Sequence, residues 1–213
     1  LLSGDYAYIN TCQDNYSGKT ASTLTQKAVS LTSGQTCSCS ASKPPLANGV
    51  YTVSTPGHLK WLAANATSTK SFSGYTIKLA NDIDMKDVTS WTPIGNATCP
   101  AGGVDAVITG TAWSGTFDGN GYKIKNLKLV SNGSTAGANY GLFGVLAPGS
   151  LVQNFIFDAT CSLEVTATAS IATGMLAGYV FDATVRDVTN HGSMTFKGKA
   201  GAVFMSMALI GQV

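Results

Sequence analysis

The chain has 213 residues, of which 44% are hydrophobic and 11% are charged, and its formal net charge is +2. This hydrophobic content is enough to bury a core and excludes an intrinsically disordered chain, although the charged fraction is well below the average of about 25%. The basic residues are scattered along the chain and form no block, so neither nucleic acid nor an anionic membrane surface is expected as a partner.

Residues 1–47 are predicted to form an N-terminal extension or arm. They are rich in Ser and Thr, hold three cysteines, and approach their end with Lys43-Pro44-Pro45, which favours a stiff extended segment. Residues 21–31 alternate loosely between apolar and polar side chains and could form a strand. The expected role of this segment is a cap or an arm.

Residues 48–213 are predicted to form one β-rich domain that begins with a short strand and a short helix. Residues 50–53 are the expected strand, and residues 56–64 carry apolar side chains at helical spacing. Thr55 is a plausible N-cap and Pro56 pre-sets the first turn. The helix is therefore expected to lie across the open end of a larger structure. Residues 75–79 then alternate as a strand.

The second half of the domain contains an internal repeat. Three apolar units with internal glycines occupy positions 141–146, 174–180 and 208–213, and their last glycines, Gly144, Gly178 and Gly211, recur at a nearly constant spacing. The first two units are each followed by a turn and an alternating strand, at 151–157 and 183–188. Such a period is typical of a solenoid, in which each repeat stacks its apolar side chains on the next.

The most apolar stretch, positions 200–213, is predicted to be a buried strand pair. It is interrupted by Gly201 and Gly211. Because it is too short and too interrupted to span a bilayer, no membrane span is expected in this chain.

Several motifs follow one another in a recognisable order. They are Tyr51-Thr-Val, His58-Leu-Lys-Trp61, Tyr75-Thr-Ile-Lys-Leu-Ala-Asn-Asp82-Ile-Asp84, Trp91-Thr-Pro-Ile-Gly95, Phe117-Asp-Gly-Asn-Gly-Tyr-Lys-Ile124 and Gly141-Leu-Phe-Gly144. Their order resembles the GLUG-repeat family of secreted and cell-surface proteins. The resemblance covers residues 48–213 and implies a right-handed parallel β-helix and an adhesin-like role. The short helix is then expected to cap the β-helix, and residues 1–47 are expected to form an extended arm outside it.

These motifs also have a structural interpretation. The segment Asp118-Gly119-Asn120-Gly121 predicts a tight turn with positive φ at Asn and Gly, and a bend or bulge is expected near Asn126. Residues 91–95 predict an apolar corner. Asn126 and Asn154 are candidates for an asparagine ladder inside the helix, with each amide bonding to turn backbone.

Catalysis has little support in the sequence. Asp82, Asp84 and Asp118 lie inside the motifs and are candidates for paired carboxylates or Ca²⁺ ligands, but short Asp side chains more often bond turn backbone. His58 is expected to cap the short helix and His191 to occupy a turn before Gly192, without a nucleophile motif beside either. The chain is therefore expected to be no enzyme and to need no cofactor, with Ca²⁺ the one candidate metal ion.

Aromatic residues offer a second kind of site. Trp113 and Tyr140 are candidates for an exposed platform on which sugar rings stack, and the alternative is that they belong to the core. Trp113 is favoured because it lies in the polar stretch Thr-Gly-Thr-Ala-Trp-Ser-Gly. Cell-surface glycans are accordingly a candidate partner.

Two further features favour a secreted or cell-surface location. Four glycosylation sequons begin at Asn15, Asn65, Asn96 and Asn132. An odd number of cysteines leaves one thiol that is free or bonded to another chain. The disulfide candidates are Cys12, Cys37, Cys39, Cys99 and Cys161.

The expected function is that of an extracellular structural or adhesive surface protein. A bare β-helix end exposes apolar residues and unpaired backbone groups, so either the natural protein continues beyond Val213 or a neighbouring subunit docks there. On the second alternative, self-association through the helix ends or the N-terminal arm into a filament or surface layer is expected. The alternatives are a glycan-binding module and a β-helix lyase or hydrolase that acts on carbohydrate.

Overall fold

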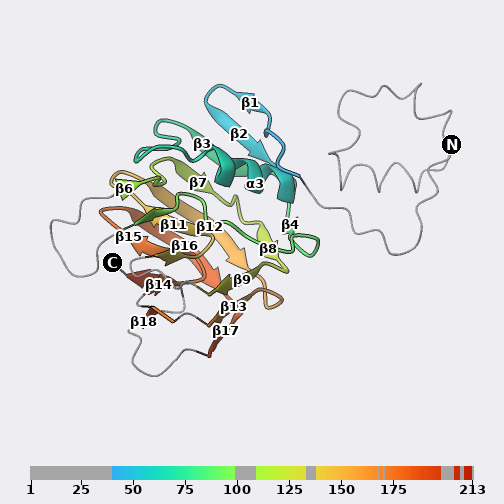
Figure 1. The fold of residues 1–213 in the computed structure, drawn as a ribbon. Helices are drawn as coiled ribbons and strands as arrows, with labels where there is room; N and C mark the ends of the chain where they lie inside the picture. The colour runs from blue at the N-terminus through green and yellow to red at the C-terminus, as the bar shows by residue number, and fades with distance from the viewer. Residues whose placement is uncertain are drawn as a thin grey trace, which may run out of the picture.

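The computed structural model describes residues 40–98, 109–132, 138–166, 168–169, 171–197, 204–206 and 209–212. Within these ranges the protein consists of short strands and one helix, α3, so its class is all-β, as predicted (Figure 1). The described helix is too short to cross a membrane. The elements are β1 (Leu46–Ala47), β2 (Val50–Val53), α3 (Pro56–Asn65), β3 (Thr76–Leu79), β4 (Ile83–Asp84), β5 (Ala97–Thr98), β6 (Thr109–Gly110), β7 (Thr116–Asp118), β8 (Lys123–Lys125), β9 (Lys128–Ser131), β10 (Asn139–Tyr140), β11 (Phe143–Leu146), β12 (Leu151–Phe157), β13 (Ser162–Val165), β14 (Ile171–Thr173), β15 (Ala177–Val180), β16 (Thr184–Asn190), β17 (Ser193–Phe196), β18 (Phe204–Ser206) and β19 (Ile210–Gln212).

A hairpin and the helix close one end of the molecule. β1 pairs antiparallel with β2 through a turn in which Asn48 and Gly49 both have positive φ. The predicted helix is confirmed: the Thr55 hydroxyl accepts a hydrogen bond from the backbone N–H of His58, and Pro56 occupies the first turn. The helix buries Leu59 and Leu62 completely, so it covers the core at this end.

The largest sheet is built from strands stacked in parallel. β2, β3, β7, β12 and β16 lie side by side in that order. Their register places one core residue of each strand above the next, in the column Tyr51, Ile77, Phe117, Val152 and Val185. Tyr75, which the alternation assigned to the same face as Ile77, precedes β3 and is 41% exposed.

The long strand β12 pairs with two shorter strands, because the previous row is interrupted by a turn. β7 pairs with its first half and β8 with its second half. Between them Asn120 and Gly121 have φ of 54° and 81°, and the N–H of Tyr122 donates to the Gly119 carbonyl at 2.9 Å. The predicted tight turn is therefore confirmed. Asn126, with φ of 55°, separates β8 from β9, as the expected bend required.

Three smaller parallel sheets complete the repeats, in the orders β9-β13-β17, β10-β14-β18 and β11-β15-β19. Phe143 pairs with Ala177, and Ala177 pairs in turn with Ile210, so the predicted repeat is confirmed as stacked strands. We call residues 116–146 repeat unit 1, residues 151–180 repeat unit 2 and residues 184–212 repeat unit 3. The two strands found in positions 200–213 belong to different sheets and do not pair with each other.

The two ends of the stack differ. α3, β1 and β2 lie at one end, and β17 and β18 lie at the opposite end (Figure 1). Within the described residues, the strands of repeat unit 3 pair on one side only. Their core-facing side chains are also less covered: Phe196 is 50% exposed, whereas its partner Val165 in repeat unit 2 is fully buried. The end formed by repeat unit 3 is therefore open in the described part of the chain.

The domain boundary predicted at residue 47 is not tested by the structure. Residues 1–39 and the possible strand at 21–31 lie outside the described residues. The last residues of the predicted arm do contact the domain, since the N–H of Ser42 donates to the Gly57 carbonyl at 3.0 Å and β1 pairs with β2.

Candidate functional site

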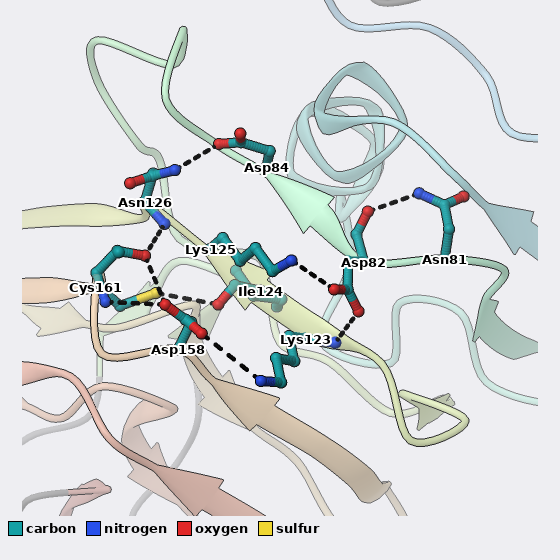
Figure 2. Close-up of polar contacts among 10 residues, drawn as sticks. Asn81, Asp82, Asp84, Lys123, Ile124, Lys125, Asn126, Asp158 and Cys161 are labelled. Carbon is teal, nitrogen blue, oxygen red and sulfur yellow. Dashed lines mark hydrogen bonds and ion pairs between the residues drawn. The ribbon is translucent and has the colours of Figure 1, made fainter.

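A network of charged side chains connects neighbouring rows of the stack (Figure 2). Lys123 and Lys125 flank Ile124 in β8, and because side chains alternate along a strand, both lysines face outward while Ile124 is buried. The Nζ atom of Lys125 lies 2.6 Å from Oδ2 of Asp82, just before β4. The Nζ atom of Lys123 lies 3.8 Å from Oδ2 of Asp158, just after β12. The two ion pairs thus link three successive rows.

Hydrogen bonds extend this network around the adjoining corner. The side-chain amide of Asn126 donates to Asp84 Oδ1 at 2.7 Å, and its backbone N–H donates to the hydroxyl of Thr160 at 2.9 Å. That hydroxyl donates to Asp158 Oδ1 at 3.0 Å. The left-handed backbone at Asn126 allows its amide and N–H to reach two different rows, so this residue joins them.

A second polar ladder runs along the same sheet. Asp118, Gln153 and Arg186 occupy one column of β7, β12 and β16. Gln153 Nε2 donates to Asp118 Oδ2 at 3.3 Å, and Arg186 Nε donates to Gln153 Oε1 at 2.8 Å. The amide of Asn154 also donates to Asp118, at 3.3 Å.

The predicted asparagine ladder is wrong in its position and its partners. Asn126 and Asn154 are both partly exposed and donate to carboxylates, where the sequence suggested an interior ladder bonded to turn backbone. The physical reason is the left-handed backbone at each residue, which places it on the outer side of its strand.

The carboxyl groups of both ladders are held ionised. Hydrogen bonding to the Lys125 ammonium, followed by the N–H of Lys123, lowers the pKa of Asp82. For Asp118, burial alone would raise the pKa, but hydrogen bonds from the N–H of Asn120 and from neighbouring amide side chains outweigh it and lower the pKa. The backbone and hydroxyl of Thr160 lower the pKa of Asp158. None of these three groups is therefore a general acid at neutral pH.

The three aspartates predicted as Ca²⁺ ligands do not form one site. Asp82 and Asp84 belong to the network of Figure 2, whereas Asp118 belongs to the second ladder. Within the described residues no group of three or more His, Cys, Asp or Glu side chains lies close enough to hold a metal ion. Asp82 is bonded to a lysine ammonium, and Asp84 and Asp118 accept hydrogen bonds from amides.

The prediction that Trp113 is an exposed platform is wrong. Trp113 is fully buried, its indole N–H donates to the Gly115 carbonyl at 2.9 Å, and its ring stacks on Phe72 with centroids 5.1 Å apart. The indole thus belongs to the core, which was the alternative interpretation. Tyr140 lies in β10 and is half-buried, packed against the core.

The expectation that His58 caps the helix is wrong, because the N-cap is Thr55. The Nδ1 atom of His58 accepts a hydrogen bond from the backbone N–H of Ser54 at 3.1 Å, and burial lowers the pKa of His58. His58 therefore ties the helix to the strand before it. His191 lies between β16 and β17.

Of the disulfide candidates, only Cys161 falls in the described residues. It has a free, buried thiol that donates to the Ile124 carbonyl at 3.1 Å. The other four are Cys12, Cys37, Cys39 and Cys99, which lie outside those residues. Three sequon asparagines, Asn65, Asn96 and Asn132, are exposed, and Asn15 is outside the described part.

The sequence did not reveal the residues that form the ladders. Lys123, Lys125, Asp158, Gln153 and Arg186 are ordinary polar residues in their local context. A signal was nevertheless present: each occupies a non-core position of a strand or its end. Gln153 and Asp118 are 35 positions apart and Arg186 and Gln153 are 33 apart, close to the repeat period, whereas Lys125 and Asp82 are further apart. Once the register is known, this spacing predicts which charges meet.

Comparison with known proteins gives one partial match. The chain is 31% identical over 153 residues to Halomucin of Haloquadratum walsbyi, and the match covers 72% of this chain but only 2% of Halomucin. No family model matches the chain. No solved structure matches it. The resemblance to GLUG-repeat proteins therefore stays a prediction.

Proposed function

We propose that this chain is a module of a secreted or cell-surface protein with a structural or adhesive role, folded as a right-handed parallel β-helix of the GLUG type. The proposal rests on the parallel stacking of the repeat units. Repeat units 2 and 3 each contribute four strands in the same order, and each strand of one pairs in parallel with its counterpart in the other. Successive turns of a β-helix have this relationship.

The proposed location and the proposed role have support of three kinds. The match to Halomucin extends over most of the chain. The sequon asparagines at positions 65, 96 and 132 are exposed and so accessible to a glycosylating enzyme. The carboxyl groups of Asp82, Asp118 and Asp158 serve ion pairs, turns and ladders, an arrangement that favours a structural role over catalysis.

The observation that carries an assembly role is the end at repeat unit 3, which is open in the described part of the chain. Val185, Val188 and Met194 face the core there but are only half-buried, whereas Val152, Phe155 and Leu163, their partners in repeat unit 2, are buried. The other end of the stack is covered by α3 and by the antiparallel strand β1. Strands can be added at the open end, but direct stacking on the covered end is blocked.

The strand added at the open end is proposed to come from the N-terminal arm. The arm leaves the domain at the covered end, near Ser42, and the loose alternation of residues 21–31 suits an added strand. In this proposal, residues 21–31 of one copy pair with the free edge of repeat unit 3 in the next copy. Repetition of this contact would produce a filament or surface layer.

The test is the assembly state of the full chain and of matched variants, measured by sedimentation and by electron microscopy of non-reduced protein over a wide range of concentration. Val188→Lys places a charge on the open end and should abolish assembly, whereas Thr189→Lys places it on the exposed outer side and should not. Val29→Asp should also abolish assembly if residues 21–31 supply the strand. A monomeric wild-type chain at every concentration would refute the proposal, as would normal assembly of both Val188→Lys and Val29→Asp.

A further inference from the structure

An open groove lies between the two polar ladders of the main sheet and crosses all three repeat units. Its volume is about 560 Å³, within the range of roughly 300–1,000 Å³ that is common for ligand sites. The ladder residues Asp118 and Gln153 lie along one side of the groove. Lys123, Ile156 and Thr189, which pair across three neighbouring strands, lie along the other side. Its principal lining residues are Asn120, Gly121, Asn154, Ile156, Asp187 and Thr189.

A repeated backbone bend builds this groove. Asn154 in repeat unit 2 and Asp187 in repeat unit 3 have φ of 59° and 54°, and the register places them at the same point of their strands. Asn120 and Gly121 supply the left-handed residues in repeat unit 1. The left-handed region costs roughly 1–2 kcal/mol for a residue with a side chain, less for Asn and Asp. The bend recurs in repeat units 2 and 3 despite this cost, and repeat unit 1 has a tight turn at the same point, which favours a use for the surface that they form.

The bend widens the outer surface of each strand. In β12, Val152, Phe155 and Phe157 are buried. Two consecutive residues, Gln153 and Asn154, therefore lie outside the core between Val152 and Phe155, whereas a regular strand has one outward residue between two buried ones. Gly121 has open space where its side chain would be. The result is a groove with room between the ladders, running in the direction in which the rows stack.

The groove combines polar groups with one apolar surface. Asn120, Asp187 and Thr189 are exposed and offer an amide, a carboxylate and a hydroxyl, and the side chain of Ile156 is half-buried between them. The carboxylate of Asp187 has no hydrogen bond or ion pair with any residue that the structure describes. A sugar ring presents hydroxyl groups at its edge and C–H groups on its face. The polar groups of the groove can bond the hydroxyl groups, and Ile156 can contact the C–H face.

We propose that this groove binds a neutral, linear oligosaccharide along the stacking direction. Successive rows of a sheet are about 4.8 Å apart, so a ligand in this direction meets a similar set of groups at each row. A neutral chain is favoured because the unpaired charge in the groove is the Asp187 carboxylate, which repels an acidic sugar. The nearby cations are already engaged: Lys123 pairs with Asp158, and Arg186 donates to Gln153.

The proposal of this site does not rest on the aromatic residues that the sequence suggested or on end-to-end assembly, although Asp187 and Thr189 belong to the edge strand β16. The test is an NMR titration of the full chain, followed at the backbone amides, with linear hexasaccharides of glucose, mannose and galacturonic acid. At least one neutral hexasaccharide should shift the amides of Gly121, Ile156 and Thr189, and the galacturonate should bind more weakly. Each variant is first compared with the wild type by sedimentation, so that a change in assembly is recognised separately.

Matched variants locate the site. Because a hydrogen bond to a charged group is worth about 1.5–3 kcal/mol, Asp187→Ala should weaken binding by about tenfold or more. Ile156→Ala, which is away from the open end, should weaken binding as well. Glu164 is a partly exposed acid on β13, outside the groove, that pairs with Lys197, and Glu164→Ala should leave binding unchanged. The proposal fails if no neutral hexasaccharide shifts these amides, if both groove variants bind like the wild type, or if the galacturonate binds as tightly.

Discussion

The ammonium of Lys125 lies 2.6 Å from the carboxylate of Asp82, although the two residues are far apart in the chain. The contact exists because Ile83 pairs with Ile124 in the sheet, which brings the residues on either side of each into adjacent rows. The same relationship between rows gives Asp118 and Asp158 their partners. The charges of this sparsely charged protein are thus used to join rows of the stack.

The first prediction concerns acid stability. The pKa values of Asp82, Asp118 and Asp158 are lowered below the ordinary value of 3.8, so the unfolded chain binds more protons than the folded chain in this range. The stability that these groups contribute is complete above pH 3.8 and is lost as the pH falls through the folded pKa values. Urea denaturation at several pH values between 6 and 2 should show this loss.

Asp118→Asn is the control for this prediction. It removes one of the carboxyl groups whose pKa is lowered, so the variant should be less stable than the wild type at pH 6 but should lose less stability on acidification. His58 adds a separate, earlier step, because its lowered pKa means that stability falls as the pH drops from 6.5 through the folded value. An Asp118→Asn variant with the same pH dependence as the wild type would contradict the assignment.

Trp113 should be a stability residue and not a binding residue. Its ring is fully buried and lies against Phe72, Phe117 and Phe143. Truncation of a buried aromatic typically costs about 3–5 kcal/mol, and Trp113→Ala should lower the free energy of unfolding by that amount. Trp113→Phe should lose much less. Urea denaturation followed by circular dichroism measures both, and a cost below about 1 kcal/mol for the alanine variant would exclude a core role.

The contrast between correct and incorrect predictions has a physical basis. The helix was predictable because its signals are local: Thr55 caps it, Pro56 begins it and the apolar spacing follows. The strand at residues 151–157 and the glycine repeat were predictable because periodicity is also a property of the sequence alone. The burial of Trp113 was not, because polar neighbours surround it in sequence while parallel bridges to Ser71 and Leu146 hold it in the core.

The candidate site was less predictable than the fold for the same reason. The asparagines at 126 and 154 were recognised as special, but their partners, Asp84 and Asp118, are 42 and 36 residues away. Only the register between rows determines which side chains meet, and a one-residue change of register would exchange the outer and inner faces. The polar ladders and the groove between them follow from that register.

Asn154 and Asp187 allow the contribution of the ladder to be separated from backbone strain. Both residues have left-handed backbones at the same position of their strands, but only Asn154 donates to Asp118. Glycine relieves the left-handed strain, so Asp187→Gly should change the unfolding free energy by less than about 0.5 kcal/mol. Asn154→Gly also loses a hydrogen bond to a charged group and should cost about 1–2 kcal/mol. Equal effects in urea denaturation would show that the hydrogen bond contributes nothing.

Two glycines should differ sharply in their tolerance of a methyl group. A Cβ atom at Gly119 would collide with the Cβ of Phe155 and lie 2.6 Å from the Asn154 carbonyl oxygen. Gly119→Ala therefore requires the rows to separate and should cost about 3 kcal/mol or more. Gly149 has φ of 80° and open space around it, so Gly149→Ala should cost only about 1–2 kcal/mol of backbone strain. Thermal and urea unfolding of both variants would test the order, and the reverse order would mean that the rows are not packed as described.

The thiol of Cys161 should be inert in the folded protein. Burial raises its pKa, which leaves little of the reactive thiolate at neutral pH, and the side chain lies inside the stack with its S–H directed to the Ile124 carbonyl. Alkylation by iodoacetamide at pH 7.5, mapped by mass spectrometry of peptides, should label Cys161 slowly in buffer and rapidly in concentrated urea. Since alkylation requires opening of the stack, destabilising variants such as Trp113→Ala should accelerate it, whereas Thr189→Lys on the outer side should not. Rapid labelling of the folded wild type would mean that the corner between β12 and β13 opens readily, and the intermolecular disulfide considered for this chain would then have an accessible thiol.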